Sequence, residues 1–195
     1  MLFRSRIAST RAKRANTVKK QSNDAFAVWI TGLPASGKST LARALKARMA
    51  EYGVIVAILE SDELRKVLSP HPRYDEQERD IFYGQIAYIG KLLIDHGVSV
   101  LFDATANLRR YRDRARKQIP RLLEVYVDTQ LSTCMARDPK GIYRSASVNL
   151  AATVPGLNVA YEPPEHPDVV VHGADEDPEA AAQRVIAKLI ERGFL

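Results

Sequence analysis

The residues best suited to chemistry lie in one short segment, residues 32–40, which reads GLPASGKST. Two glycines with four residues between them let the backbone curl so that its N–H groups point at phosphate oxygens. Lys38 would neutralise the β- and γ-phosphates of ATP, Ser39 would ligate Mg²⁺, and Thr40 adds a second hydroxyl. The segment predicts an ATP site formed by Gly32, Leu33, Pro34, Ala35, Ser36, Gly37, Lys38, Ser39 and Thr40. The alternative to a phosphate loop is a glycine- and serine-rich turn that caps a helix by chance. In that case the position of Lys38 would be a coincidence.

A phosphate-binding loop needs a strand before it and a helix after it, and the sequence predicts both. After Asp24, short β-branched runs alternate with longer helical stretches, which is typical of βαβ units around a parallel sheet. The predicted strands span residues 26–31, 54–59, 98–102, 122–127 and 169–171, and the predicted helices span 38–52, 75–96, 108–118, 131–137 and 178–192. Residues 138–164 lack a period, which predicts a lid loop. We therefore expect an α/β fold over residues 24–195, with a parallel five-stranded sheet flanked by helices.

The composition of the 195-residue chain, 46% hydrophobic and 27% charged, is that of one globular domain without a membrane span. The net charge of +6 lies in residues 1–23, which carry seven basic and no acidic residues, so the rest carries about −1. We expect a disordered tail, with an organelle transit peptide as the alternative. Nucleic-acid binding is disfavoured because aromatic residues do not interleave the charges. The lone Cys134 cannot form an internal disulfide, which favours the cytoplasm.

Beyond the phosphate loop, residues 26–172 resemble the adenylylsulfate kinases. The similar segments are GLPASGKST from Gly32, LESDELR from Leu59, ARDPKGIY from Ala136 and YEPPEHPDVVV from Tyr161. The resemblance implies a P-loop kinase fold with a mobile lid. It implies transfer of the γ-phosphoryl of ATP to the 3′-hydroxyl of adenylylsulfate, a small-molecule acceptor of sulfate assimilation. Asp62 would be the acid near Mg²⁺ and the acceptor, Arg65 a substrate contact, and Arg137 with Lys140 part of the lid over ATP. The oligomeric state is left open, with a homodimer as one candidate.

The chain departs from the family pattern at four places. The D-G-D-N segment is replaced by residues 60–63, ESDE, and the N-x-R-R segment by residues 82–85, FYGQ. The I-S-P-[FY]-R segment is replaced by residues 105–109, TANLR, and the lysine and phenylalanine of the lid by Ala152 and Val154. The donor site is therefore expected to be intact, whereas the acceptor pocket is expected to be changed.

Asp103 is a second candidate acid, because it follows an apolar strand at the edge where open α/β sheets bind ligands. It begins a D-x-T segment similar to that of other small-molecule and polynucleotide kinases. Lys38, Asp62 and Asp103 are thus the catalytic candidates, although either aspartate would also suit a turn or helix cap. Arg109 and Arg112 lie three residues apart on one predicted helix face and are candidate contacts for an anionic substrate. A solvated face is the alternative for this arginine run.

Three function classes remain open from the sequence. An adenylylsulfate-type kinase comes first, and a related kinase acting on another small metabolite or a nucleic-acid hydroxyl comes second. A non-catalytic, nucleotide-binding regulatory protein is the third. A GTPase switch is disfavoured because the chain has no N-K-x-D segment for guanine.

Overall fold

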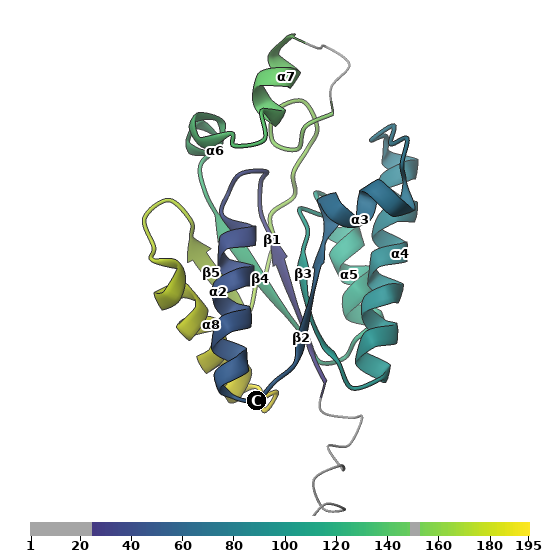
Figure 1. Cartoon of the computed structure of the whole chain (residues 1–195). Coiled ribbons are helices and arrows are strands. Elements are labelled where there is room, and N and C mark those ends of the chain that lie inside the picture. Colours follow the sequence, from purple (N-terminus) through teal and green to yellow (C-terminus); the bar gives the residue numbers. More distant parts are fainter. Residues whose placement is uncertain (1–24, 149–152) are drawn as a thin grey trace, which may run out of the picture.

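Five parallel strands form one sheet, in the spatial order β2-β3-β1-β4-β5 (Figure 1). The strands are β1 (Ala27–Thr31), β2 (Val56–Glu60), β3 (Ser99–Asp103), β4 (Leu122–Asp128) and β5 (Val169–His172). β1 occupies the centre, where it pairs with β3 on one side and β4 on the other. The prediction of a parallel five-stranded α/β sheet is confirmed.

Residues 25–148 and 153–195 are the part of the chain that this computed structural model describes. The predicted basic tail, residues 1–23, and the lid position Ala152 lie outside the described residues. Within the described part, no helix is long and apolar enough to cross a membrane.

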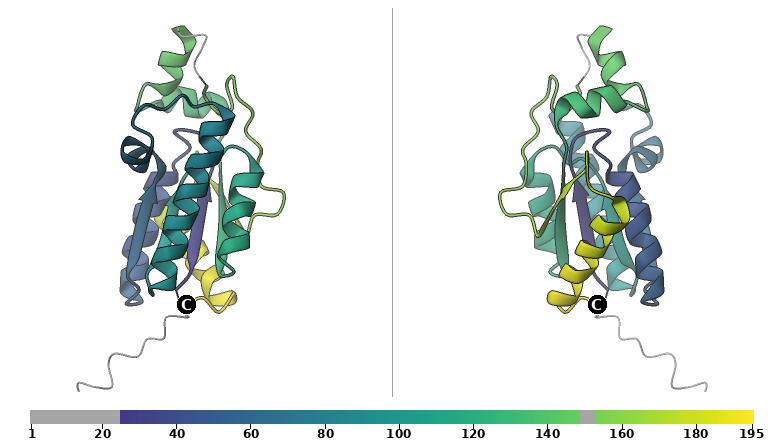
Figure 2. Two further views of the ribbon diagram at one scale, coloured as in Figure 1. Left: turned by 90° about the vertical axis from the view of Figure 1, so that its right-hand side faces the viewer. Right: turned by 90° about the vertical axis from the view of Figure 1, so that its left-hand side faces the viewer.

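Helices cover both faces of the sheet (Figure 2). One face carries α2 (Lys38–Glu51) and α8 (Pro178–Glu191), and the other carries α4 (Glu76–Asp95) and α5 (Arg109–Gln118) with the short α3 (Ser61–Leu68). Two further short helices, α6 (Leu131–Arg137) and α7 (Ile142–Val148), stand beyond the carboxyl ends of the strands. All five predicted helices are present. Two short helices are additions: α3, and α7 inside the segment predicted to be a lid loop.

The central strand contributes side chains to two hydrophobic cores, one on each face of the sheet. All five residues of β1 are buried, and successive side chains point to opposite faces. Val28 and Ile30 join the core beneath α2 and α8, whereas Ala27 and Trp29 join the core beneath α4 and α5. Trp29 stacks on Phe102 of β3 with 4.5 Å between ring centroids. This doubly covered sheet holds the carboxyl ends of its strands in fixed positions, and the candidate site lies there.

Candidate functional site

A cavity of about 630 Å³ opens at the carboxyl ends of the strands. The phosphate loop and the first turn of α2 form its floor. The remaining walls come from the start of α3, the end of β3, the α6–α7 connection and the start of α8. The predicted residues that line it are Pro34, Ala35, Ser36, Gly37, Lys38, Ser39, Thr40, Asp62, Asp103, Arg137 and Lys140. One cavity therefore collects most of the predicted donor-site residues from segments far apart in the sequence.

The phosphate loop depends on glycine at two positions. Gly32 has φ 151°, and a Cβ there would lie 2.6 Å from the carbonyl oxygen of Val127, so the strand below leaves no room for a side chain. Gly37 has φ 111° and caps the N-terminus of α2. Ala35 adopts φ 60° between them, which is a strained value for a residue with a Cβ. The loop is thus wound tightly around the start of α2, where the helix favours bound anions.

Lys38 is the first residue of α2 and its side chain is buried. Its Nζ donates to the carbonyl oxygens of Leu33, at 2.8 Å, and Gly32, at 3.2 Å, so the ammonium lies over the phosphate loop. Burial lowers the pKa of Lys38, and the negative charges of Asp103 and Asp62 partly offset that effect. Phosphate oxygens in the cavity would hold the same ammonium in its charged form.

The two candidate acids sit in different environments. Asp103 is the last residue of β3 and is buried, whereas Asp62 lies in the first turn of α3 with its side chain about half exposed. Lys140, from the α6–α7 connection, donates to Asp62 Oδ2 at 2.6 Å and lies 3.4 Å from Glu60 Oε1. Partial burial works against the charge of Lys140, but the hydrogen bond and charge of Asp62 raise its pKa overall. The lid lysine therefore bridges directly to a candidate acid.

The lid segment packs on the phosphate loop through a small apolar core of its own. Tyr143 of α7 donates to the carbonyl oxygen of Pro34 at 3.0 Å. A Cβ at Gly156 would lie 2.5 Å from the Leu33 side chain, so lid and loop are in close contact. The buried residues of this core are Cys134, Tyr143, Ala146 and Val154. Arg137 ties the base of the lid to the segment after β5 by donating to the carbonyl oxygens of Gly173 and Ala174.

The three arginines predicted to contact the substrate do not line the cavity. Arg65 is buried between α3 and α4, where it pairs with Glu78 and its Cζ lies 3.8 Å from the centroid of the Phe82 ring. Arg109 pairs with Glu165 and donates to the carbonyl oxygen of Pro163. A substrate contact by either residue would require exchange of these partners, and it stays a prediction.

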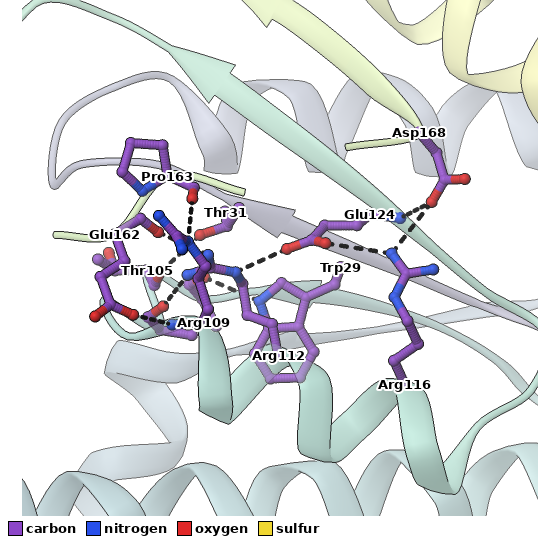
Figure 3. Close-up of polar contacts among 12 residues, drawn as sticks. Trp29, Thr31, Thr105, Arg109, Arg112, Arg116, Glu124, Glu162, Pro163 and Asp168 are labelled. Carbon is purple, nitrogen blue, oxygen red and sulfur yellow. Dashed lines mark hydrogen bonds and ion pairs between the residues drawn. The ribbon is translucent and has the colours of Figure 1, made fainter. Parts of the chain in front are cut away.

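Arg112 is the most deeply engaged of the three arginines (Figure 3). Its side chain is only 3% exposed, and all three guanidinium nitrogens donate within the protein. Nε bonds to Glu124 of β4 at 2.7 Å, Nη2 bonds to the carbonyl oxygen of Glu162 at 2.7 Å, and Nη1 bonds to that of Ala106. A substrate contact by Arg112 would require exchange of these partners, including the buried carboxylate of Glu124, and it stays a prediction. Through these hydrogen bonds, Arg112 connects α5 to β4 and to the segment after the lid.

The other arginines of α5 are also neutralised within the protein. Arg110 pairs with Glu76, Arg114 with Asp80, and Arg116 with Glu124 and Asp168. The arginine run from 109 to 116 therefore contacts acidic partners on α4, β4 and the segments flanking β5. It forms no unpaired basic stripe of the kind that binds nucleic acid.

Several residues at the site were not predicted. Glu60, Tyr143 and Gly173 contact the cavity or the phosphate loop, and Arg79 donates to the lid at the carbonyl oxygen of Thr153, at 2.6 Å. Glu60 ends β2 two residues before Asp62, so its position at the carboxyl edge was a usable signal. Tyr143 ends the segment ARDPKGIY, which was also a usable signal. Arg79 gave none, because its partner lies 74 residues away in the sequence.

Comparison with known proteins identifies the family. Residues 24–172 match the sequence model of adenylylsulphate kinase. The chain belongs to the adenylylsulphate kinase family. A probable adenylyl-sulfate kinase of Pyrococcus abyssi is 36% identical over 172 residues, covering 88% of this chain and 99% of that protein. The adenylyl-sulfate kinase of Myxococcus xanthus is 37% identical over 177 residues, covering 87% and 94%.

A solved structure of this family agrees in three dimensions. The APS kinase of Mycobacterium tuberculosis, in complex with AMPPNP and APS, superposes with a TM-score of 0.80 at 32% identity. The match covers 85% of this chain and 98% of that chain. The P-loop kinase fold predicted from the sequence is confirmed, and so is the family resemblance.

Proposed function

We propose that this adenylylsulphate kinase family member transfers the γ-phosphoryl group of ATP to the 3′-hydroxyl of adenylylsulfate. The observation that carries the proposal is the single cavity in which Lys38, Asp62 and Asp103 meet above a phosphate loop. Family membership and the likeness to an APS kinase with AMPPNP and APS bound support the choice of donor and acceptor.

The donor side of the cavity suits ATP with Mg²⁺. The loop N–H groups and Lys38 would hold the β- and γ-phosphates, while the apolar wall at Val171 and Ala181 suits a purine ring. Ser39 and Asp62 offer the oxygen ligands that Mg²⁺ prefers. The described residues contain no cluster of three or more His, Cys, Asp or Glu that could hold a metal unaided. That fits an ion carried mainly by nucleotide phosphates, which when bound neutralises charge on the transferred group.

The chain's own residues then have distinct tasks in the transfer. Asp62 would accept the proton of the acceptor hydroxyl while that oxygen bonds to the γ-phosphorus and the bond to the β-phosphate oxygen breaks, releasing ADP. Lys38 would stabilise charge on the phosphates, and Asp103 would balance the charge of Lys38. The lid, held by Tyr143 on the phosphate loop, would exclude water that competes with the acceptor.

Replacing Lys38 tests the proposal. Lys38→Met keeps the apolar stem and removes the charge, so we expect ADP release with adenylylsulfate to fall at least about a thousandfold with little change in unfolding temperature. The exposed Lys46→Met, on the same helix, is the matched control and should keep full activity. Undiminished turnover in folded Lys38→Met would overturn the kinase assignment. Turnover with other hydroxyl acceptors, but not adenylylsulfate, would favour the related-kinase alternative.

We also propose that the chain forms a homodimer through the outer face of α4. Ile81, Tyr88 and Leu92 are exposed apolar side chains at spacings of seven and four residues, which place them on one side of the helix. A second copy is the commonest partner for such a face. Light scattering should give twice the chain mass for the wild type and a monomer for Tyr88→Glu. A monomeric wild type would contradict the proposal.

The proposed location is the cytoplasm, in line with a single buried cysteine that forms no disulfide. Fractionation of cells that express the full chain tests this, and recovery in an organelle would instead support import through the basic N-terminus.

A further inference from the structure

Two of the segments that depart from the family pattern, residues 82–85 and 105–109, contact each other. Tyr83, in the replaced segment of α4, accepts a hydrogen bond at its hydroxyl from the backbone N of Ala106, at 3.0 Å. Ala106 belongs to the replaced segment after β3. Its neighbour Asn107 donates from Nδ2 to the carbonyl oxygen of Ala160, at 2.9 Å, on the return arm of the lid. The changed segment of α4 and the changed loop after β3 are therefore connected, and the loop also contacts the return arm of the lid.

The loop between β3 and α5, residues 104–108, is held at each carbonyl oxygen from residue 104 to residue 107. Trp29 Nε1 donates to the carbonyl oxygen of residue 104 at 3.3 Å, and Thr31 Oγ1 donates to that of residue 105 at 2.6 Å. Arg112 donates to the carbonyl oxygen of residue 106, and the backbone N of Glu162 donates to that of residue 107 at 2.8 Å. With Tyr83, five groups from four segments fix this loop: β1, α4, α5 and the segment before β5 (Figure 3 shows the Trp29, Thr31 and Arg112 side).

The conformation that these bonds maintain is strained. Ala106 has φ 40°, in the left-handed region that residues with a Cβ avoid. Ala106 is fully buried and Tyr83 is 3% exposed, so water cannot replace the hydroxyl as the partner of the Ala106 N–H. Strained backbone held by surrounding contacts is common where a loop must present groups to a ligand.

We propose that Tyr83 is a positioning residue for the acceptor, which acts by fixing the loop after β3. This inference rests on the proposed function. Thr105, near the start of this loop, lines the cavity. The phosphate loop and the lid have their own contacts through Lys38 and Tyr143. Loss of the Tyr83 hydroxyl should therefore disturb the acceptor while ATP binding is kept.

Tyr83→Phe tests the proposal, because it removes one oxygen and keeps the ring. Tyr111→Phe is the matched control. Its buried ring stacks on that of Tyr83 with 4.8 Å between centroids, but its hydroxyl makes only long contacts, at 3.4 Å to the carbonyl oxygen of Glu76 and 3.5 Å to Arg110. We expect Tyr83→Phe to lower kcat/KM for adenylylsulfate about tenfold, with KM for ATP changed less than about twofold. Tyr111→Phe should match the wild type in both constants.

Amide hydrogen exchange gives a second readout that needs no acceptor. In Tyr83→Phe, a peptide spanning residues 103–110 should exchange about tenfold faster than in the wild type, and in Tyr111→Phe it should not. Unchanged exchange in this peptide, equal losses for both substrates, or the same kinetic loss in Tyr111→Phe would overturn the role of Tyr83. A wild type that does not phosphorylate adenylylsulfate would overturn the proposed function instead, and the exchange experiment would still decide whether Tyr83 holds the loop.

Discussion

Asp62 and Asp103 reach the same cavity from settings that suit different tasks. Asp62 is half exposed and paired with a lid lysine, so it can exchange that partner for a ligand when the site fills. Asp103 is buried, and its charge partly offsets the lowering of the Lys38 pKa by burial. We therefore expect Asp62 to serve the acceptor and Asp103 to hold the charge balance of the donor site.

Asparagine at position 62 tests this division. Asp62→Asn should lower kcat at least about a hundredfold, the lower range for loss of a general base, with nucleotide binding largely kept. Glu63→Gln is the control, because Glu63 is a neighbouring carboxylate that pairs only with the exposed Lys66. Steady-state kinetics and nucleotide titration measure both effects. If Asp62→Asn changes kcat little and Asp103→Asn lowers it strongly, the roles assigned to the two aspartates are reversed.

At the scale of elements, the arginines of α5 contribute differently to the free energy of unfolding, because their ion pairs differ in burial. Arg112 and Glu124 form a buried pair, whereas Arg114 and Asp80 are each 36% exposed. Arg112→Ala should lower the free energy of unfolding by about 3 kcal/mol, since it leaves Glu124 with only the partly exposed Arg116. Arg114→Ala, two residues further along α5, should cost about 0–1 kcal/mol. Denaturant unfolding checks both, and equal losses would contradict the distinction.

The elements also show where sequence reasoning succeeds. The five strands and the ATP loop were predicted because each depends on a local pattern, such as the nine residues GLPASGKST. Helix α7 was missed because its sequence IYRSASV has no amphipathic period, and it packs instead through Tyr143 on the phosphate loop. The role of Arg112 was missed because Glu124 lies on another element, where spacing along α5 gives no signal. These contacts join residues far apart in the sequence, so a local pattern does not predict them.

At the scale of the whole molecule, residues near the C-terminus complete the core around the start of β1. Phe26, directly after the first described residue, is buried, and its ring lies 6.1 Å from that of Phe194 near the C-terminus. Residues 1–23 carry seven positive charges and few large apolar side chains. Deleting them should change the melting temperature by less than about 2 °C and leave kcat unchanged. A large fall in the melting temperature would mean that the tail contributes to the packed structure.

The strength of acceptor binding is also a property of the whole molecule. Adenylylsulfate is an anion with an adenine ring, so its pocket needs cations and a planar group. Here Arg65, Arg109 and Arg112 have the partners Glu78, Glu165 and Glu124, and the N-x-R-R segment that would add cations is FYGQ. Each missing charged contact costs about 1.5–3 kcal/mol, which is about ten- to a hundredfold in affinity.

We therefore expect a KM for adenylylsulfate at least about tenfold above that of a family member with the N-x-R-R and I-S-P-[FY]-R segments, measured in the same assay. Glu165→Gln adds a directional test, because it releases the exposed guanidinium of Arg109 from its carboxylate partner. If Arg109 contacts the acceptor, this variant should lower KM, whereas Glu63→Gln should not. A wild-type KM equal to that of the comparison enzyme would contradict the prediction of a changed acceptor pocket and would leave the family assignment standing.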